Sequence, residues 1–106
     1  MDKKQALKKA QQYANLIKDK LKPEKVILYG SYAKGTWDEN SDIDIAIIVD
    51  KIDDLLTSEA LLYKLRRGID DRIEPVLFER NNNRSGFLDE ILKHGQVIYN
   101  ISDSIL

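Results

Sequence analysis

The sequence predicts an α/β domain in which helices cover a sheet. Segments with the three- and four-residue spacing of amphipathic helices alternate along the chain with short β-branched runs, which are typical of buried strands. The 106 residues, 42% of them apolar, are enough for one hydrophobic core. We therefore expect residues 1–106 to form a single domain, with a loosely held tail at 100–106.

The chain begins with a predicted helix, a strand and a tight turn. Apolar residues recur every three to four positions over residues 3–21, with lysines on the opposite side, and Pro23 ends this helix. Residues 25–29 form a β-branched run that predicts a buried strand ending at Gly30. Residues 31–35 then predict a turn into a short helix.

A second strand is predicted over residues 43–49. Successive side chains of a strand point to opposite faces of a sheet. One face is therefore expected to carry Asp42, Asp44, Ala46 and Ile48, and the other Ile43, Ile45, Ile47 and Val49. The two carboxylates can therefore reach the same small volume.

The next segments predict a helix and an edge strand. Residues 55–67 predict a full helix, with Thr57 or Ser58 as its N-cap. Residues 73–79 predict the third strand. Pro75 has no N–H group for a sheet ladder, so this strand is expected at or near a sheet edge.

The remaining residues predict a loop, a last helix and a candidate extra strand. The loop covers residues 80–86, and the helix covers residues 87–93. His94 and Gly95 close this helix, with Gly95 expected in the left-handed conformation. Residues 96–99 are a candidate for a short extra strand.

Composition restricts the chemistry that the chain can perform. The absence of cysteine excludes a disulfide framework, cysteine-ligated zinc and a thiol nucleophile, and with one histidine a metal site must use oxygen ligands. The longest apolar stretch, residues 45–49, is too short to span a membrane. The lysine-rich start also lacks the apolar segment of a signal peptide, so we expect a cytoplasmic protein.

The net charge of −1 conceals two blocks of opposite sign. Residues 1–25 carry a net +5, and residues 38–59 carry a net −7. The basic block lacks the interleaved aromatic residues of a nucleic-acid surface, so we infer no direct binding of DNA or RNA. The acidic block overlaps the strongest motif of the sequence.

The first half of that motif is Gly-Ser-Tyr-Ala-Lys-Gly at residues 30–35. Gly30 and Ser31 form a turn between a strand and a helix, where backbone N–H groups and a hydroxyl can bind phosphate oxygens. A P-loop is excluded, because Thr36 stands where that motif requires lysine.

The second half is Ser-Asp-Ile-Asp-Ile at residues 41–45. Asp42 and Asp44 repel each other on one strand face unless a cation neutralises them, and Mg²⁺ binds one or two carboxylates together with substrate phosphates. Glu74 on the third strand is a candidate third carboxylate, which would complete a two-metal site. The alternative interpretation of Glu74 is a solvent-facing acid on an edge strand.

Other side chains that could serve a site have simpler interpretations. Tyr32 and Trp37 are expected to pack beneath the loop rather than stack on a base. Three arginines are interpreted as solvated residues near a helix end: Arg66, Arg67 and Arg72.

The combined motif, G-S-Y-A-K-G followed by S-D-I-D-I, closely resembles the G-S-x-x-x-G and D-x-D signature of the DNA polymerase beta-like nucleotidyltransferases. The chain length resembles their minimal nucleotidyltransferase (MNT) branch, and the resemblance extends from the first helix through the third strand. It implies a nucleotidyltransferase fold with a mixed α+β architecture and a three-stranded core sheet in the order 1-2-3.

The resemblance also implies a role for each residue of the motif. Gly30 and Ser31 would hold triphosphate oxygens, and Asp42 and Asp44 would bind Mg²⁺. Glu74 replaces the aspartate that the family usually has, and it would bind a second Mg²⁺ or accept the proton of the acceptor hydroxyl.

The function implied by the resemblance is Mg²⁺-dependent transfer of AMP from ATP to a hydroxyl. In the antitoxin branch the acceptor is a tyrosine of a HEPN-domain ribonuclease toxin, which the transfer neutralises. One alternative is an inactive protein of the same fold that neutralises its partner by binding alone. Another is a small-molecule nucleotidyltransferase of the antibiotic-modifying kind, although those enzymes generally have a further domain for the acceptor.

Overall fold

The computed structural model describes residues 1–82 and 86–104. Its elements follow the order α1 (Lys3–Leu21), β1 (Lys25–Tyr29), α2 (Ser31–Lys34), β2 (Ile43–Val49), α3 (Leu55–Arg66), β3 (Ile73–Glu79), α4 (Phe87–His94), β4 (Gln96–Asn100) and the 3₁₀ helix η2 (Ile101–Ser104). The predicted alternation of helices and strands is therefore confirmed.

The strands form one mixed sheet in the order β3-β2-β1-β4. β2 pairs antiparallel with β1 and parallel with β3, and β4 pairs antiparallel with β1. The prediction of a three-stranded sheet is therefore wrong. Val26, Ile27 and Leu28 of β1 are completely buried, so β1 is an inner strand with a partner on each side, and β4 is the second of these partners.

β3 lies at the edge of the sheet, as the proline within it predicts. Pro75 is paired in register with Ile45 of β2, and an edge strand tolerates a proline because it has a partner on one side only. At the other end of the sheet, η2 follows β4, and Ile101 N donates to Glu24 O at 2.9 Å. Residues 83–85 of the expected loop and residues 105–106 of the expected tail lie outside the described residues.

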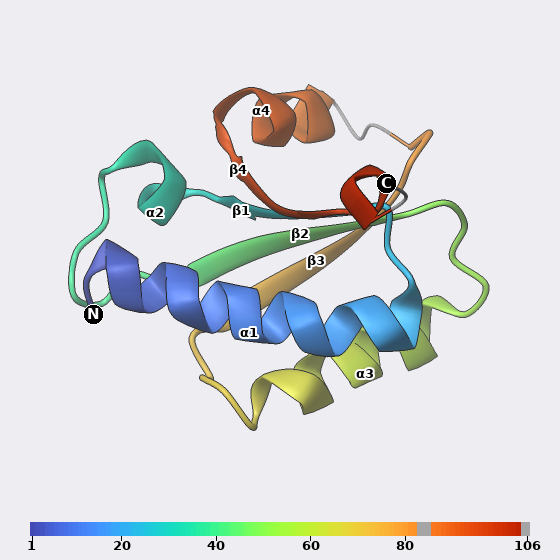
Figure 1. Ribbon diagram of the computed structural model, residues 1–106, viewed down its shortest axis with the longest axis horizontal. Helices are drawn as coiled ribbons and strands as arrows, with labels where there is room; N and C mark the ends of the chain where they lie inside the picture. The colour runs from blue at the N-terminus through green and yellow to red at the C-terminus, as the bar shows by residue number, and fades with distance from the viewer. Residues whose placement is uncertain (83–85, 105–106) are drawn as a thin grey trace.

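Helices cover both faces of the sheet (Figure 1). α1 and α3 pack on one face, and α4 lies on the other. Ile43, Ile45 and Ile47 of β2 belong to the core with α1 and α3, whereas Ala46 and Ile48 belong to the core with α4. The alternation predicted for β2 is therefore confirmed.

Polar contacts fix the helices. Asp2 caps α1, because its side chain accepts a hydrogen bond from Gln5 N at 2.8 Å and its own N–H donates to Gln5 Oε1 at 3.0 Å. The predicted N-cap of α3 is wrong, because Asp54 occupies that position and accepts from the backbone N and the hydroxyl of Thr57. A carboxylate at the N-cap also faces the positive end of the helix.

Asp70 connects α1 to the loop before β3. Its carboxylate accepts from Lys9 Nζ at 2.5 Å and from Arg72 Nε at 3.1 Å, and these contacts, the hydrogen bond from Arg72 above all, hold the pKa of Asp70 well below its ordinary value. The carbonyl of Arg72 accepts from Ile43 N at 2.8 Å. The Asp70 contacts therefore fix the start of β2, where the predicted metal ligands lie.

None of the helices in residues 1–82 and 86–104 is long and apolar enough to cross a bilayer.

Candidate active site

Three polar side chains form one row across the sheet. Tyr29 of β1 is paired with Asp44 of β2, and Asp44 is paired with Glu74 of β3. Paired residues on neighbouring strands point to the same face and lie about 5 Å apart. Asp42 precedes β2 on this face as well, so the structure brings the three predicted carboxylates to one end of the sheet.

This row is electrostatically unfavourable in the protein alone. Burial, and then the charges of Asp42 and Glu74, raise the pKa of the Asp44 carboxyl to about 6. Burial and the charges of Asp44 and Glu74 raise the pKa of Tyr29 to about 12. Asp44 therefore lies among like charges in a half-buried position, where a cation would stabilise its ionised form.

Gly30 brings the two halves of the sequence motif into contact. Its φ of 72° and ψ of −149° are a conformation that L residues avoid. A Cβ atom added to Gly30 would overlap Asp44 Oδ2 and lie 3.0 Å from Asp44 Cγ. The backbone of the predicted phosphate-binding turn therefore passes directly beside the predicted metal ligand.

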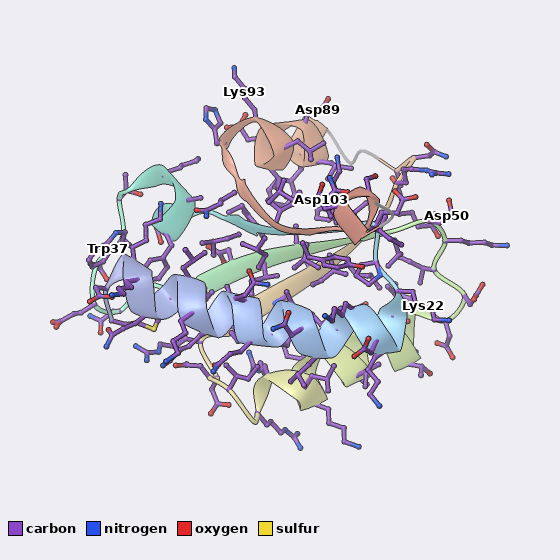
Figure 2. The ribbon with its side chains drawn as sticks, in the orientation of Figure 1. Lys22, Trp37, Asp50, Asp89, Lys93 and Asp103 are labelled. Atoms are coloured by element: carbon purple, nitrogen blue, oxygen red, sulfur yellow. The ribbon has the colours of Figure 1, made fainter. Side chains whose placement is uncertain are left out.

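The turn continues into α2, which is a single helical turn. Lys34 N donates to Gly30 O and Gly35 N donates to Ser31 O, both at 3.0 Å, so the N–H groups at the start of α2 remain free of helical partners. Tyr32 is completely buried and stacks on Trp37, with ring centroids 5.6 Å apart. Figure 2 shows Trp37 in the loop that follows α2. Because its ring stacks on the buried ring of Tyr32, the prediction that both rings pack beneath this loop is confirmed.

Arg66 is a residue that the sequence interpretation missed. Its Nη1 donates to the carbonyl of Ile73 at 2.8 Å and to Glu74 Oε1 at 3.5 Å, and its guanidinium lies over the ring of Tyr63. It is therefore not a solvated helix-end residue but a link between α3 and the start of β3. No local signal in the sequence pairs Arg66 with Glu74, because α3 and β3 meet only in the folded chain.

The oxygen donors suit Mg²⁺ in part. Asp44 supplies a carboxylate beside the turn at Gly30, and Asp42 lies near enough to Asp44 for its charge to raise the pKa of that carboxyl. Two carboxylates are a donor set that Mg²⁺ accepts when phosphates and waters complete its coordination. Within the part of the chain that the structure describes, however, no three His, Cys, Asp or Glu side chains are grouped to hold a metal ion. Glu74 is 44% exposed and pairs with Arg66 instead.

The mixed sheet, the helices on both faces and the Gly-Ser turn beside an aspartate pair define a nucleotidyltransferase fold. The family described as "Polymerase beta, Nucleotidyltransferase" matches residues 11–104. The chain belongs to this polymerase beta nucleotidyltransferase family. "Putative protein adenylyltransferase MJ0604" of Methanocaldococcus jannaschii is 37% identical, over 93% of this chain and 100% of that protein.

Two of the solved structures with this fold are toxin–antitoxin complexes. A chain of a toxin–antitoxin structure with AMP-PNP has a TM-score of 0.68 and 25% identity, over 85% of this chain and 73% of that chain. A chain of the tri-AMPylated Shewanella oneidensis HEPN toxin in complex with MNT antitoxin has a TM-score of 0.67 and 19% identity, over 93% and 76% of the two chains. The second likeness shows the fold alone.

Proposed function

We propose that this chain transfers AMP from ATP to a hydroxyl in a Mg²⁺-dependent reaction. The observation that carries the proposal is the contact between the turn at Gly30 and the carboxylate of Asp44. A triphosphate held on the free N–H groups and the hydroxyl of the turn would have its α-phosphate beside the aspartates. ATP as the substrate also agrees with the expected cytoplasmic location.

The reaction needs one bond to form and one to break. The acceptor oxygen attacks the α-phosphorus, and the bond from that phosphorus to the β-phosphate oxygen breaks to release pyrophosphate. Gly30 and Ser31 would hold the oxygens of the departing pyrophosphate. Asp42 and Asp44 would hold Mg²⁺, which neutralises the charge that develops on the phosphates.

Glu74 is the candidate base for the acceptor hydroxyl. It lies in the same row as Asp44, one strand nearer the open edge of the sheet, where an acceptor can approach. Its side chain is 44% exposed, so an acceptor hydroxyl can reach the carboxylate. Binding of a second Mg²⁺ is the other role that Glu74 could have, and it would require Glu74 to leave Arg66.

The proposed acceptor is a tyrosine of a HEPN-domain toxin, with this chain as the antitoxin. Two observations support this choice. A relative that matches this chain over its full length is named as a putative protein adenylyltransferase. A chain of the same fold also occurs in a complex with a HEPN toxin.

Intact-mass spectrometry of the toxin partner tests this function. With ATP and Mg²⁺, the wild-type chain should add one or more AMP units, whereas the variant with both Asp42→Asn and Asp44→Asn should add none. A matched control, Asp53→Asn with Asp71→Asn, removes two exposed acids outside the row and should transfer normally. Undiminished transfer by the first variant would contradict the proposed mechanism.

A non-catalytic antitoxin is the second candidate, because the contact between Arg66 and Glu74 keeps one expected carboxylate from the metal site. This function predicts that the variant with both Asp42→Asn and Asp44→Asn still neutralises the partner. It also predicts that the partner purified with the wild-type chain carries no added AMP mass.

A further inference from the structure

A pocket opens between α4 and the turn at Gly30. Its volume is about 160 Å³, and the residues of its wall that matter here are Tyr29, Gly30, Lys34, Phe87, Glu90 and His94. We call it the α4 pocket. About five water molecules of about 30 Å³ each would fill this volume, so it suits one ring system rather than a whole nucleotide.

The α4 pocket has an aromatic wall. The rings of Tyr29 and Phe87 are in edge contact, with centroids 5.9 Å apart and planes at 80°. Phe87 is also in edge contact with Phe78, which fixes its ring from a second side. Phe87 nevertheless remains 43% exposed, so part of this rigid ring is open to a ligand.

The α4 pocket also has polar groups in its lining, because Glu90 and His94 line it on the same helix as Phe87. Glu90 Oε1, a hydrogen-bond acceptor, lies 3.5 Å from His94 Nε2. Figure 2 shows Asp89 and Lys93 on the outer side of α4, away from the sheet, whereas Glu90 and His94 line the pocket. An acceptor beside an imidazole N–H can pair with a base edge that presents a donor next to an acceptor, such as the edge of adenine.

The α4 pocket is continuous with the proposed phosphate site, because Gly30 lines the pocket and also contacts Asp44. We propose that the α4 pocket holds the purine base of the nucleoside triphosphate, stacked on Phe87. This inference rests on the proposed function, since it assumes that the triphosphate lies on the turn at Gly30. It makes Phe87 a residue that determines substrate specificity.

Calorimetric titration with two kinds of probe tests the assignment. Inorganic tripolyphosphate with Mg²⁺ engages the turn and the aspartates but has no base. The α,β-methylene analogues of ATP, GTP and CTP carry a base and cannot be cleaved at the bond that the reaction breaks. The wild-type chain should bind the two purine analogues more tightly than the CTP analogue, and the CTP analogue no more tightly than tripolyphosphate.

Substitutions at Phe87 separate stacking from packing. Phe87→Leu keeps an apolar side chain but removes the ring, and it should weaken purine binding by at least about fivefold without changing tripolyphosphate binding. Phe87→Trp keeps a ring face and should retain purine binding. Leu92→Ala is the matched control, because Leu92 is 42% exposed on the same helix and does not line the α4 pocket.

Glu90→Ala provides a second test if Phe87→Leu does not fold, because Glu90 is 57% exposed at the pocket rim. It should weaken purine binding several-fold and leave tripolyphosphate binding unchanged. Equal binding of purine analogues and tripolyphosphate by the wild-type chain would overturn the assignment of the α4 pocket to the base, and so would the absence of any effect of Phe87→Leu and Glu90→Ala. Either result would leave the proposed function standing. Failure of the wild-type chain to bind any probe would overturn the proposed function and this assignment with it.

Discussion

Substitution of Gly30 by alanine perturbs the two halves of the site at once. The φ of 72° and ψ of −149° at Gly30 are unfavourable for an L residue, and the added Cβ atom would occupy the space of Asp44 Oδ2. The carboxylate of Asp44 belongs to an inner strand, so it can make room only by rotating away from the turn. We therefore expect Gly30→Ala to strain the backbone and to misplace a metal ligand.

Two magnitudes follow from this geometry. Backbone strain in a sparsely populated region costs about 1–3 kcal/mol, which lowers the melting temperature of a domain of this size by roughly 5–15 °C. Displacement of a reacting group by about 1 Å costs about a hundredfold in rate. Gly35→Ala is a matched control, because Gly35 also has a positive φ, of 80°, but an added Cβ would meet nothing within 4 Å.

Thermal unfolding and AMP transfer, measured on both variants, separate strain from misplacement. Gly30→Ala and Gly35→Ala should both melt below the wild type, since alanine at either position costs conformational energy. Only Gly30→Ala should also lose about a hundredfold in transfer and bind Mg²⁺ with nucleotide more weakly. Wild-type transfer by Gly30→Ala, or an equal loss in both variants, would refute the role given to the contact with Asp44.

Charge and hydrogen bonding at other positions have measurable effects. In the metal-free protein, the carboxyl of Asp44 should titrate near pH 6, as followed by carbon-detected NMR. Asp42→Asn should lower this pKa because it removes a like charge. An unchanged pKa of Asp44 in this variant would contradict the electrostatic account. Asp70→Asn should lower the free energy of unfolding in urea at neutral pH. Its difference from the wild type should shrink as the pH falls below about 4, because a lowered pKa gives its full stabilisation above the unfolded pKa and loses it progressively below that value. A difference that stays constant to low pH would argue against this. Arg66→Met should cost about 1–2 kcal/mol of unfolding free energy through the lost hydrogen bond to the Ile73 carbonyl, and a variant as stable as the wild type would show that this bond contributes nothing.

The parts of the site that the sequence predicts are those that local rules determine. Side-chain alternation in a strand places Asp42 and Asp44 on one face without any knowledge of the rest of the fold. A glycine between a strand and a helix likewise indicates a close approach of the backbone at Gly30. Pro75 even predicts an edge strand, because a missing N–H group is a property of the residue itself.

The parts that the sequence does not predict depend on long-range packing. Arg66 has the same sequence surroundings as a solvated arginine, and only the meeting of α3 with β3 gives it two acceptors. Gly95 was expected in the left-handed conformation but has a φ of −80°. Position 95 requires glycine because there is no room for a side chain: an added Cβ atom would lie 2.5 Å from both Ile27 Cγ2 and Ile91 O.

Asp44 and Asp70 differ in the direction of their pKa shifts, and this is the difference expected between a carboxylate that binds a ligand and one that stabilises the fold. Asp70 has a lowered pKa, so its ionised form stabilises the folded protein at neutral pH. Asp44 has a pKa raised to about 6, above the ordinary value, so its ionised form lowers the stability of the free protein at neutral pH. The destabilising position of this half-buried carboxylate is explained if a cation and a triphosphate bind beside it. Binding of the cation then relieves the repulsion between the carboxylates.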